Sequence, residues 1–290
     1  MQEGIKKHFF GLKIILSIIL VATTVSIVAA FLHDAAEGNS SISETIPKAA
    51  IIDQLYDDIP NDWFHEKASE LLKQAGYEVD IFTTKDITID FYKSLPSHNY
   101  KFVIARSHGA ADENDQNIVT LFTGEKYTTE KYITEQLFGQ IKKGIPFQEV
   151  AFLVNSTKSE WIIVNDTYST LSVPANAMVS NDEEFFLITP DFVDSNMEGT
   201  FSNTIFLLGG CSTMQTDTMA KSLVKRGASS VIGWDNKIGS HDNDIIMLRI
   251  LERLFVSEME LEDAVDTIMK EHPIEKMAYP ARLSVYLEGI

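Results

Sequence analysis

Short apolar runs alternate with amphipathic segments through the first half of the chain. The apolar run at residues 49–53 and the alternating run at residues 77–82 predict two strands. Between them lies a predicted helix with its apolar side chains on one face, which Asn61 and Asp62 cap and which ends at Gly76. A strand, a helix and a strand at this spacing favour a βαβ unit and a parallel sheet.

The same alternation returns around the only cysteine of the chain. Residues 204–208 form an apolar run too short for a helix, and two glycines break its continuation, so Cys211 falls in the turn that leaves a strand. An amphipathic helix is predicted to follow, for which Ser212 and Thr213 are good N-cap residues. A second apolar strand then ends at Trp234.

The rest of the pattern is irregular in the middle of the chain and clearer towards its end. Residues 100–105 predict a third strand, which runs directly into Ser107, His108 and Gly109. The other predicted helices cover residues 89–95, 129–143, 190–196, 242–256 and 261–270, and the other predicted strands cover residues 118–122, 150–154, 161–164 and 283–287. We therefore expect a single α/β domain over residues 48–290.

The N-terminal region has a different composition. Residues 14–32 are 19 consecutive residues without a charge, and three lysines precede them. This length matches the roughly 20 residues of a membrane span and exceeds the roughly 7–15 residues of a signal-peptide core. We expect one transmembrane signal anchor here, with residues 1–13 as a cytoplasmic stub, residues 33–47 as a polar linker and the domain outside the cytoplasm. Cleavage within residues 28–30 would instead release the domain as a secreted protein.

Charge and cysteine usage exclude several functions. Lysine and arginine total 24 against 42 acidic residues, a formal net charge of -18, which disfavours nucleic acid as a partner and favours a basic substrate. One cysteine allows no internal disulfide, and the paired cysteines of a structural zinc site are absent. The chain also lacks a P-loop, a Gly-x-Gly-x-x-Gly turn and a Gly-x-Ser-x-Gly elbow, so nucleotide binding and serine hydrolysis are weak interpretations.

Four predicted strands carry a reactive or recognition residue at their carboxyl end or in the turn that follows: Asp53, His108, Cys211 and Trp234. In an open parallel sheet, ligands bind at the carboxyl ends of the strands, where loops converge. A histidine within reach of a cysteine on a neighbouring strand end is what thiol nucleophilic catalysis needs, since one group attacks and the other moves protons. His241, in the loop after Trp234, is the alternative base. Without such a partner, Cys211 would act as a small buried hydrophobe.

Local features near the cysteine favour this chemistry. A thiol near the positive end of a helix can have its pKa lowered from about 8.5 to roughly 3.5–7.5, and we expect Cys211 in that position. Gly109 and Gly210 would let a substrate backbone approach closely. The backbone amides of Gly109 and Cys211 are candidates for stabilising an oxyanion.

Three motifs carry a family resemblance. The sequence FVIARSHG at residues 102–109, followed about a hundred residues later by IFLLGGCS at residues 205–212, resembles the caspase-like (clan CD) cysteine peptidases. Within that group the chain is most similar to the gingipain, clostripain and CHAT branch, because of Cys-Ser-Thr and the run RGASSVIGW at residues 226–234. The resemblance covers roughly residues 48–290 and implies a Rossmann-like, mostly parallel sheet with helices on both faces.

The resemblance also implies roles for single residues. Cys211 would be the nucleophile, His108 its proton-transfer partner and Gly109 part of the oxyanion hole, while Trp234 would form a wall of the pocket for the substrate side chain before the scissile bond. In members selective for basic side chains, an acidic residue at the base of that pocket pairs with the substrate cation. Asp53 is the candidate here, and the alternatives are Asp57, Asp58 and Asp235.

The chain departs from the family around Cys211. Its residues match neither the Gln-Ala-Cys-Arg-Gly of caspases nor the glycine-ending loop common in metacaspases, so the resemblance does not define the substrate class. Several relatives bind calcium, and the polar residues 112–115 follow His108 closely. That run has no glycine at the sixth and no glutamate at the twelfth position of a calcium loop, so we interpret it as a solvated loop, with Ca²⁺ as the only cofactor under consideration.

These observations together predict a membrane-tethered cysteine endopeptidase. It would cleave a peptide or protein through a thioester acyl-enzyme at Cys211, with a preference for cleavage after Arg or Lys. Two alternatives stay open: a catalytically inactive surface receptor or scaffold of the same fold, and a transpeptidase or amidase that uses the same pair.

Overall fold

A computed structural model describes residues 46–111, 117–149, 154–155, 158–159, 178–180, 183–274, 277 and 279–287. These residues belong to one compact unit, Ile46–Ile290. In the described residues no helix has the length and apolar character needed to cross a membrane. The predicted anchor at residues 14–32 lies outside the described residues.

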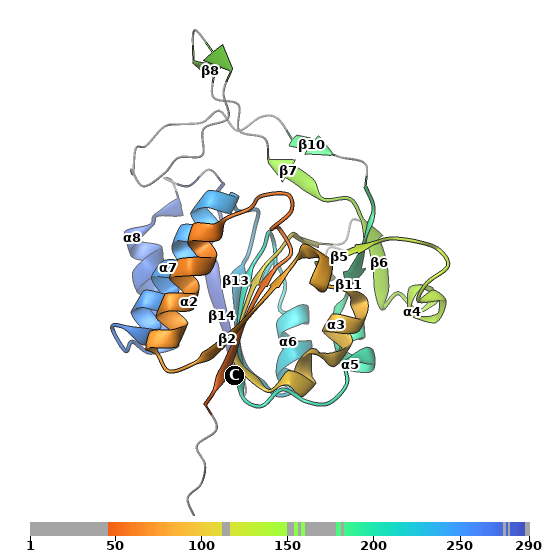
Figure 1. The fold of residues 1–290 in the computed structure, drawn as a ribbon, viewed down its shortest axis with the longest axis horizontal. Coiled ribbons are helices and arrows are strands. Elements are labelled where there is room, and N and C mark those ends of the chain that lie inside the picture. The colour runs from red at the N-terminus through yellow and green to blue at the C-terminus, as the bar shows by residue number, and fades with distance from the viewer. Residues whose placement is uncertain are drawn as a thin grey trace, which may run out of the picture. The chain divides into compact units, whose positions relative to one another are not determined.

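A six-stranded sheet forms the centre of the unit (Figure 1). Its strand order is β14-β13-β12-β3-β1-β2, and every neighbouring pair is parallel except β13 with β14. The strands are β1 (Lys48–Asp53), β2 (Glu78–Thr83), β3 (Tyr100–Arg106), β12 (Thr204–Gly209), β13 (Ala228–Trp234) and β14 (Leu283–Leu287). Strand order therefore reverses between β1 and β3, which is the switch point where α/β sheets bind ligands.

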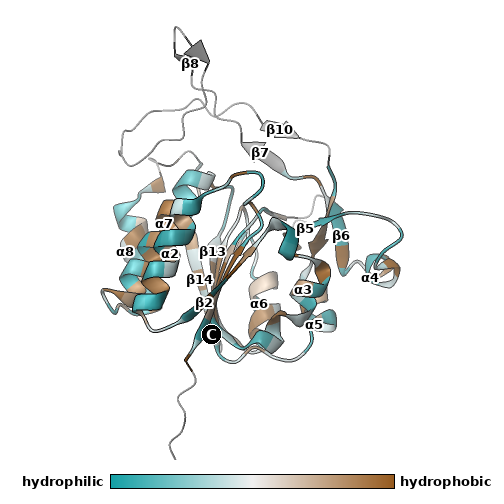
Figure 2. Cartoon of the chain, viewed as in Figure 1, coloured by the Kyte–Doolittle hydropathy of each residue, from teal (hydrophilic) through white to brown (hydrophobic). Residues whose placement is uncertain are grey.

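Helices cover both faces of this sheet (Figure 1). One apolar core lies under α2 (Asp62–Gln74), α7 (Ser240–Phe255) and α8 (Leu261–Glu271). The other lies under α3 (Ile89–Ser94), α5 (Pro190–Asn196) and α6 (Thr218–Lys225). Because both faces are buried, the central strands carry continuous apolar runs, which Figure 2 shows as brown strands between the two helical layers. The predicted α/β fold with a mostly parallel sheet is confirmed.

A smaller antiparallel sheet, β4-β5-β11-β6, contributes apolar side chains to the core under α3, α5 and α6. Its strands are β4 (Gly109–Ala111), β5 (Val119–Lys126), β11 (Phe185–Ile188) and β6 (Ile141–Gly144). Short pairs add β7 (Phe147–Glu149) with β10 (Met178–Ser180), and β8 (Val154–Asn155) with β9 (Lys158–Ser159). Two single turns, η1 (Thr84–Asp86) and η2 (Leu95–His98), flank α3. Because β4 begins directly after His108, this second sheet fixes the exit of the chain from the edge of the main sheet.

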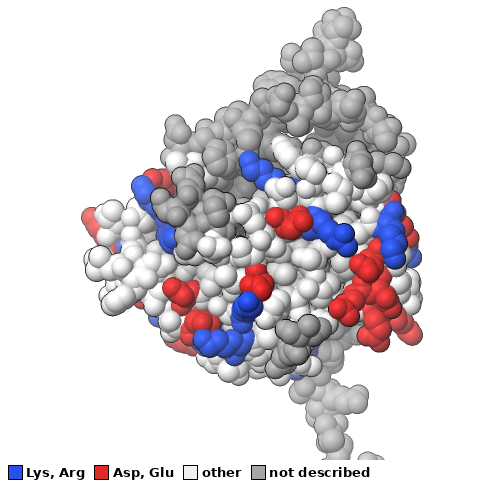
Figure 3. All heavy atoms as spheres, turned by 180° about the vertical axis from the view of Figure 1, so that it is seen from behind, with Lys and Arg blue, Asp and Glu red and all other residues white. Residues whose placement is uncertain are grey.

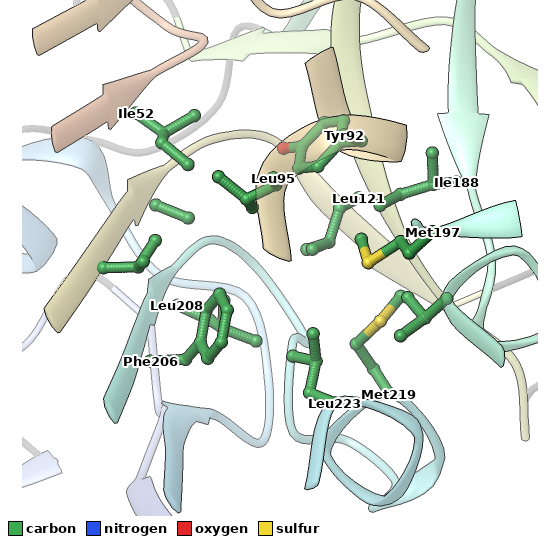
Figure 4. Close-up of a pocket in the computed structure, with 13 residues that line it drawn as sticks. Ile52, Tyr92, Leu95, Leu121, Ile188, Met197, Phe206, Leu208, Met219 and Leu223 are labelled. Atoms are coloured by element: carbon green, nitrogen blue, oxygen red, sulfur yellow. The ribbon is translucent and has the colours of Figure 1, made fainter. Parts of the chain in front are cut away.

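The core between the two sheets contains one small gap (Figure 4). Apolar side chains such as Ile52, Tyr92 and Leu208 line it, and its volume is about 10 Å³. That is at the lower limit of the space that one water molecule needs, and the lining offers almost no polar partner for it. We interpret the gap as a packing defect rather than a ligand site.

Most predicted elements are present, and two predictions were wrong. The helix predicted over residues 129–143 is only α4 (Ile133–Leu137), because Gly139 adopts φ 70° and residues 141–144 pair with β11 instead. The helix predicted directly after Cys211 begins only at Thr218. Of the strand predicted at residues 150–154, only Val154 is described, as part of β8, and the strand predicted at residues 161–164 lies outside the described residues.

Gly124 tests the packing that joins β5 to the turn η1, which follows β2. A β-carbon at this position would lie 1.8 Å from the carbonyl oxygen of Thr84, so the backbone has to move. We expect Gly124→Ala to lower the free energy of unfolding by about 1–3 kcal/mol in urea denaturation. Lys126→Ala, on the same strand and 69% exposed in its side chain, is the control and should change it by less than about 1 kcal/mol. Equal stability of the two variants would contradict this packing.

Candidate active site

The loops that carry His108 and Cys211 touch each other at the carboxyl edge of the sheet. Their strands, β3 and β12, are parallel neighbours in which Arg106 lies opposite Gly209, and the Ser107 amide donates to the Gly209 carbonyl at 3.2 Å. A β-carbon at Gly109 would lie 2.5 Å from the carbonyl oxygen of Cys211. Only glycine permits this approach, so the two candidate catalytic residues stand on adjoining backbone segments.

His108 is held by its backbone on both sides. Its amide donates to Oε1 of Gln54 at 2.9 Å, and its carbonyl accepts from the Phe122 amide at 3.2 Å. Its ring meets the Phe122 ring edge to face at a centroid distance of 5.6 Å, and Nε2 lies 3.9 Å from Oδ2 of Asp58. Within the described part of the chain, Nε2 is buried and has no hydrogen-bond partner. The imidazole is therefore well positioned and has capacity for a further polar contact.

Cys211 lies in a turn, not at the start of a helix. Ser212 adopts φ 57°, and the Thr213 hydroxyl donates to the carbonyls of Leu208 and Gly210 at 3.1 Å each. These bonds stop the backbone from entering a helix, so the expected position of the sulfur beside a helix N-terminus was wrong. The half-buried Sγ instead lies 3.5 Å from both the amide nitrogen and the carbonyl oxygen of Ile238.

Gly210 is constrained by both loops. A β-carbon on Gly210 would lie 2.5 Å from the Ser107 carbonyl oxygen and 3.3 Å from the Gly109 nitrogen. The glycines at positions 109 and 210 are therefore required for the two loops to pack. Whether they also bind substrate stays a prediction.

Beneath the two loops, a charged network is buried against α2 and α7. The guanidinium of Arg106, fully buried, donates through Nε and Nη2 to the two carboxylate oxygens of Asp244, at 2.7 and 3.0 Å. Its Nη1 donates to Oδ1 of Asp53 at 2.9 Å. Burial alone would lower the pKa of Arg106, but attraction and hydrogen bonds from Asp244 and then Asp53 outweigh it, so its pKa is raised.

The network extends to four further side chains. His65 Nε2 lies 2.7 Å from the other oxygen of Asp53, and Asn61 donates to Asp244 at 2.7 Å. Trp234 donates through its indole nitrogen to Asn243 at 3.0 Å, and Asn243 donates to Asp244 at 3.3 Å. The ends of β1, β3 and β13 are in this way tied to α2 and α7.

The structure separates the predicted site residues into two groups. His108, Gly109, Gly210 and Cys211 come together. Asp53 and Trp234 are both 0% exposed and belong to the buried network, so neither side chain is accessible to a substrate in this conformation.

The alternatives to these residues lie nearer the surface. Asp57, Asp235 and His241 are exposed, and Asp58 is partly exposed. Asp235 accepts a hydrogen bond from the Arg282 amide at 2.7 Å, which ties it to the last strand. Only Asp58 among these four has a described contact with His108.

Sequence reasoning missed three residues that shape the site: Gln54, Arg106 and Asp244. Gln54 and Arg106 were visible as polar residues at the ends of apolar strands, which is an unusual position for a buried side chain. Asp244 carried no such signal, because it lies in an amphipathic helix with other acidic residues.

The described residues contain no group of three metal-ligating side chains. Residues 112–115, considered for calcium, lie outside the described residues. On the face in Figure 3, acidic and basic side chains are scattered among uncharged ones, with several acidic side chains gathered at one edge. This view shows no continuous basic surface of the kind that binds nucleic acid.

No known family model matches the chain.

The buried network predicts a large stability effect at Arg106. Arg106→Met removes the cation that two buried carboxylates share, and we expect it to lower the free energy of unfolding by about 3–5 kcal/mol. Lys225→Met is the control, because Lys225 pairs with Asp194 at the surface and should contribute less than about 1 kcal/mol. Chemical denaturation followed by tryptophan fluorescence would measure both. A cost below about 1 kcal/mol at Arg106 would contradict the proposed importance of the network.

Proposed function

We propose that the protein is a cysteine endopeptidase in which Cys211 and His108 form the catalytic pair. The observation that carries this proposal is the direct packing of the His108 loop on the Cys211 loop, at the carboxyl ends of neighbouring parallel strands. Loops at this edge are where α/β sheets bind ligands. The resemblance to caspase-like peptidases, in the motifs at residues 102–109 and 205–212, supports the same pairing.

The proposed reaction has two steps. Cys211 loses its proton to His108 and its sulfur attacks the substrate carbonyl, and the amine leaves with a proton from His108 as a thioester forms. Water then attacks the thioester, His108 takes one of its protons, and the sulfur leaves to regenerate Cys211. The peptide bond is exchanged for a carboxylate and a free amine, and the enzyme is unchanged.

The surroundings of both residues support this assignment. The backbone amide of Ile238 lies 3.5 Å from Sγ and can donate a hydrogen bond to a thiolate. The His108 backbone is fixed by Gln54 and Phe122, which limits the motion of the proton-transfer group. Gly109 remains the candidate for the oxyanion hole, because it directly follows His108 and its backbone packs against that of Cys211.

Selectivity for Arg or Lys is a further part of the proposal. Asp53 no longer supports it, because its carboxylate is enclosed and paired with Arg106 and His65. The support comes instead from Asp235, which follows the last residue of β13 and is exposed to solvent. An acid at this position would attract a substrate cation to the carboxyl edge of the sheet.

One observation favours a second function. Cys211 packs against the core under α2, α7 and α8, and its sulfur lies within hydrogen-bonding distance of both backbone polar atoms of Ile238. These contacts suit a structural cysteine in a scaffold or receptor that keeps the fold without catalysis. Reactivity of the thiol separates the two functions.

We also propose that residues 14–32 anchor the protein in the membrane, with the peptidase domain outside the cytoplasm. The support is the length of the uncharged stretch and the lysines that precede it.

Peptide cleavage tests the catalytic pair directly. The full chain should cleave fluorogenic peptides, with Arg or Lys before the scissile bond preferred over Asp or Asn. Cys211→Ala and His108→Ala should each lower kcat/KM by at least about 10³-fold. His98→Ala, a change at an exposed histidine elsewhere, should leave cleavage unchanged.

Two results would decide against the peptidase. If the wild-type chain cuts no peptide and iodoacetamide modifies Cys211 no faster than a buried thiol, the scaffold is the better assignment. If an added amine is joined to the peptide in place of water, the protein is a transpeptidase with the same pair.

Membrane fractionation tests the anchor. The full chain should remain in the membrane pellet after a carbonate wash, and a variant that lacks residues 1–47 should appear in the soluble fraction. A full chain recovered in soluble, shortened form would instead show that the N-terminal segment is cleaved.

A further inference from the structure

The loop between β1 and α2 brings one carboxylate to the ring of His108. Oδ2 of Asp58 lies 3.9 Å from His108 Nε2. This distance is too long for a hydrogen bond and short enough for strong attraction between a carboxylate and a charged imidazole. The side chains are only 21% and 14% exposed, so water weakens the attraction less than it would at the surface.

Several hydrogen bonds hold this loop in place. Gln54 donates its amide to the Arg106 carbonyl at 2.9 Å and accepts the His108 amide through its side chain. The Thr84 hydroxyl donates to the Gln54 carbonyl and accepts from the Asp57 amide, both at 3.0 Å. The Asp58 amide donates to the Leu55 carbonyl at 3.1 Å. Asp58 is therefore presented to His108 by a defined loop rather than by a solvated segment.

The other contacts described for His108 are with uncharged residues. Phe122 packs against the ring from β5, and Gln54 binds the backbone amide. The Nε2 atom itself is buried and has no hydrogen-bond partner among the described residues. A proton on this nitrogen would be costly to bury without an acceptor, and Oδ2 of Asp58, at 3.9 Å, is a carboxylate oxygen near it.

We propose that Asp58 is a positioning residue for His108. Its carboxylate keeps Nε2 turned towards the loop after β1 and stabilises the imidazolium that forms when His108 takes a proton from Cys211. With Nε2 committed to Asp58, Nδ1 is the nitrogen left for proton transfer. This role rests on the proposed catalytic pair and assigns Asp58 to the histidine rather than to a substrate cation.

The test compares Asp58→Asn with Asp57→Asn in the full chain. Both changes remove one negative charge from the same loop, but Asp57 is exposed and has no described side-chain contact with His108. Asp58→Asn should lower kcat about tenfold with little change in KM, and Asp58→Glu should restore most of it. Asp57→Asn should leave kcat unchanged.

An NMR measurement of the His108 tautomer separates this proposal from the proposed function. The ring nitrogen signals are assigned by their loss in His108→Ala. In the neutral ring the proton should lie on Nε2, and this preference should be lost in Asp58→Asn and kept in Asp57→Asn. If the chain proves inactive but Asp58→Asn changes the tautomer, the contact is supported and the peptidase is not. If the chain is active and Asp58→Asn alters neither kcat nor the tautomer, or if it raises KM only for basic substrates, the positioning role is wrong.

Discussion

The buried pairing of Arg106 with Asp244 and Asp53 is the interaction on which the arrangement of the strand ends depends. A guanidinium with no solvent exposure is tolerated only where its donors meet acceptors of opposite charge, and here three donors meet two carboxylates. The two acids come from β1 and α7, and the arginine is the last residue of β3. The residues that follow β3, Ser107 and His108, therefore leave the sheet from a fixed point.

That fixed point also defines where the loop after β3 meets the loop after β12. Arg106 lies opposite Gly209 in the parallel register of β3 and β12, so the two strands end at the same level and their loops emerge side by side. The glycines at positions 109 and 210 then let the loops touch without interposed side chains. A parallel sheet with helices on both faces supplies the rigid base, and the loops at its edge supply the chemistry.

Much of the fold could be predicted because it depends on local patterns. The helix from Asp62 to Gln74 begins where Asn61 caps it and ends before Gly76 at φ 88°, and both signals are visible in the sequence. The segment at residues 129–143 could not be predicted in the same way, since its pairing with β11 depends on a strand about forty residues away. The prediction of a helix directly after Cys211 failed for a related reason. The Thr213 hydroxyl donates to the carbonyls of Leu208 and Gly210 and does not cap a helix.

The sequence by itself determined most of the elements, the mostly parallel sheet and the position of His108 and Cys211 just after strand ends, because hydrophobic periodicity and glycine placement act over a few residues. Only the tertiary structure decided which polar residues are accessible. Asp53 and Trp234 end strands as His108 does, yet they face α2 and α7 and are enclosed by Arg106, His65 and Asn243. The side of the sheet to which a strand-end residue points depends on register and helix packing, and these are set by contacts between residues far apart in the chain.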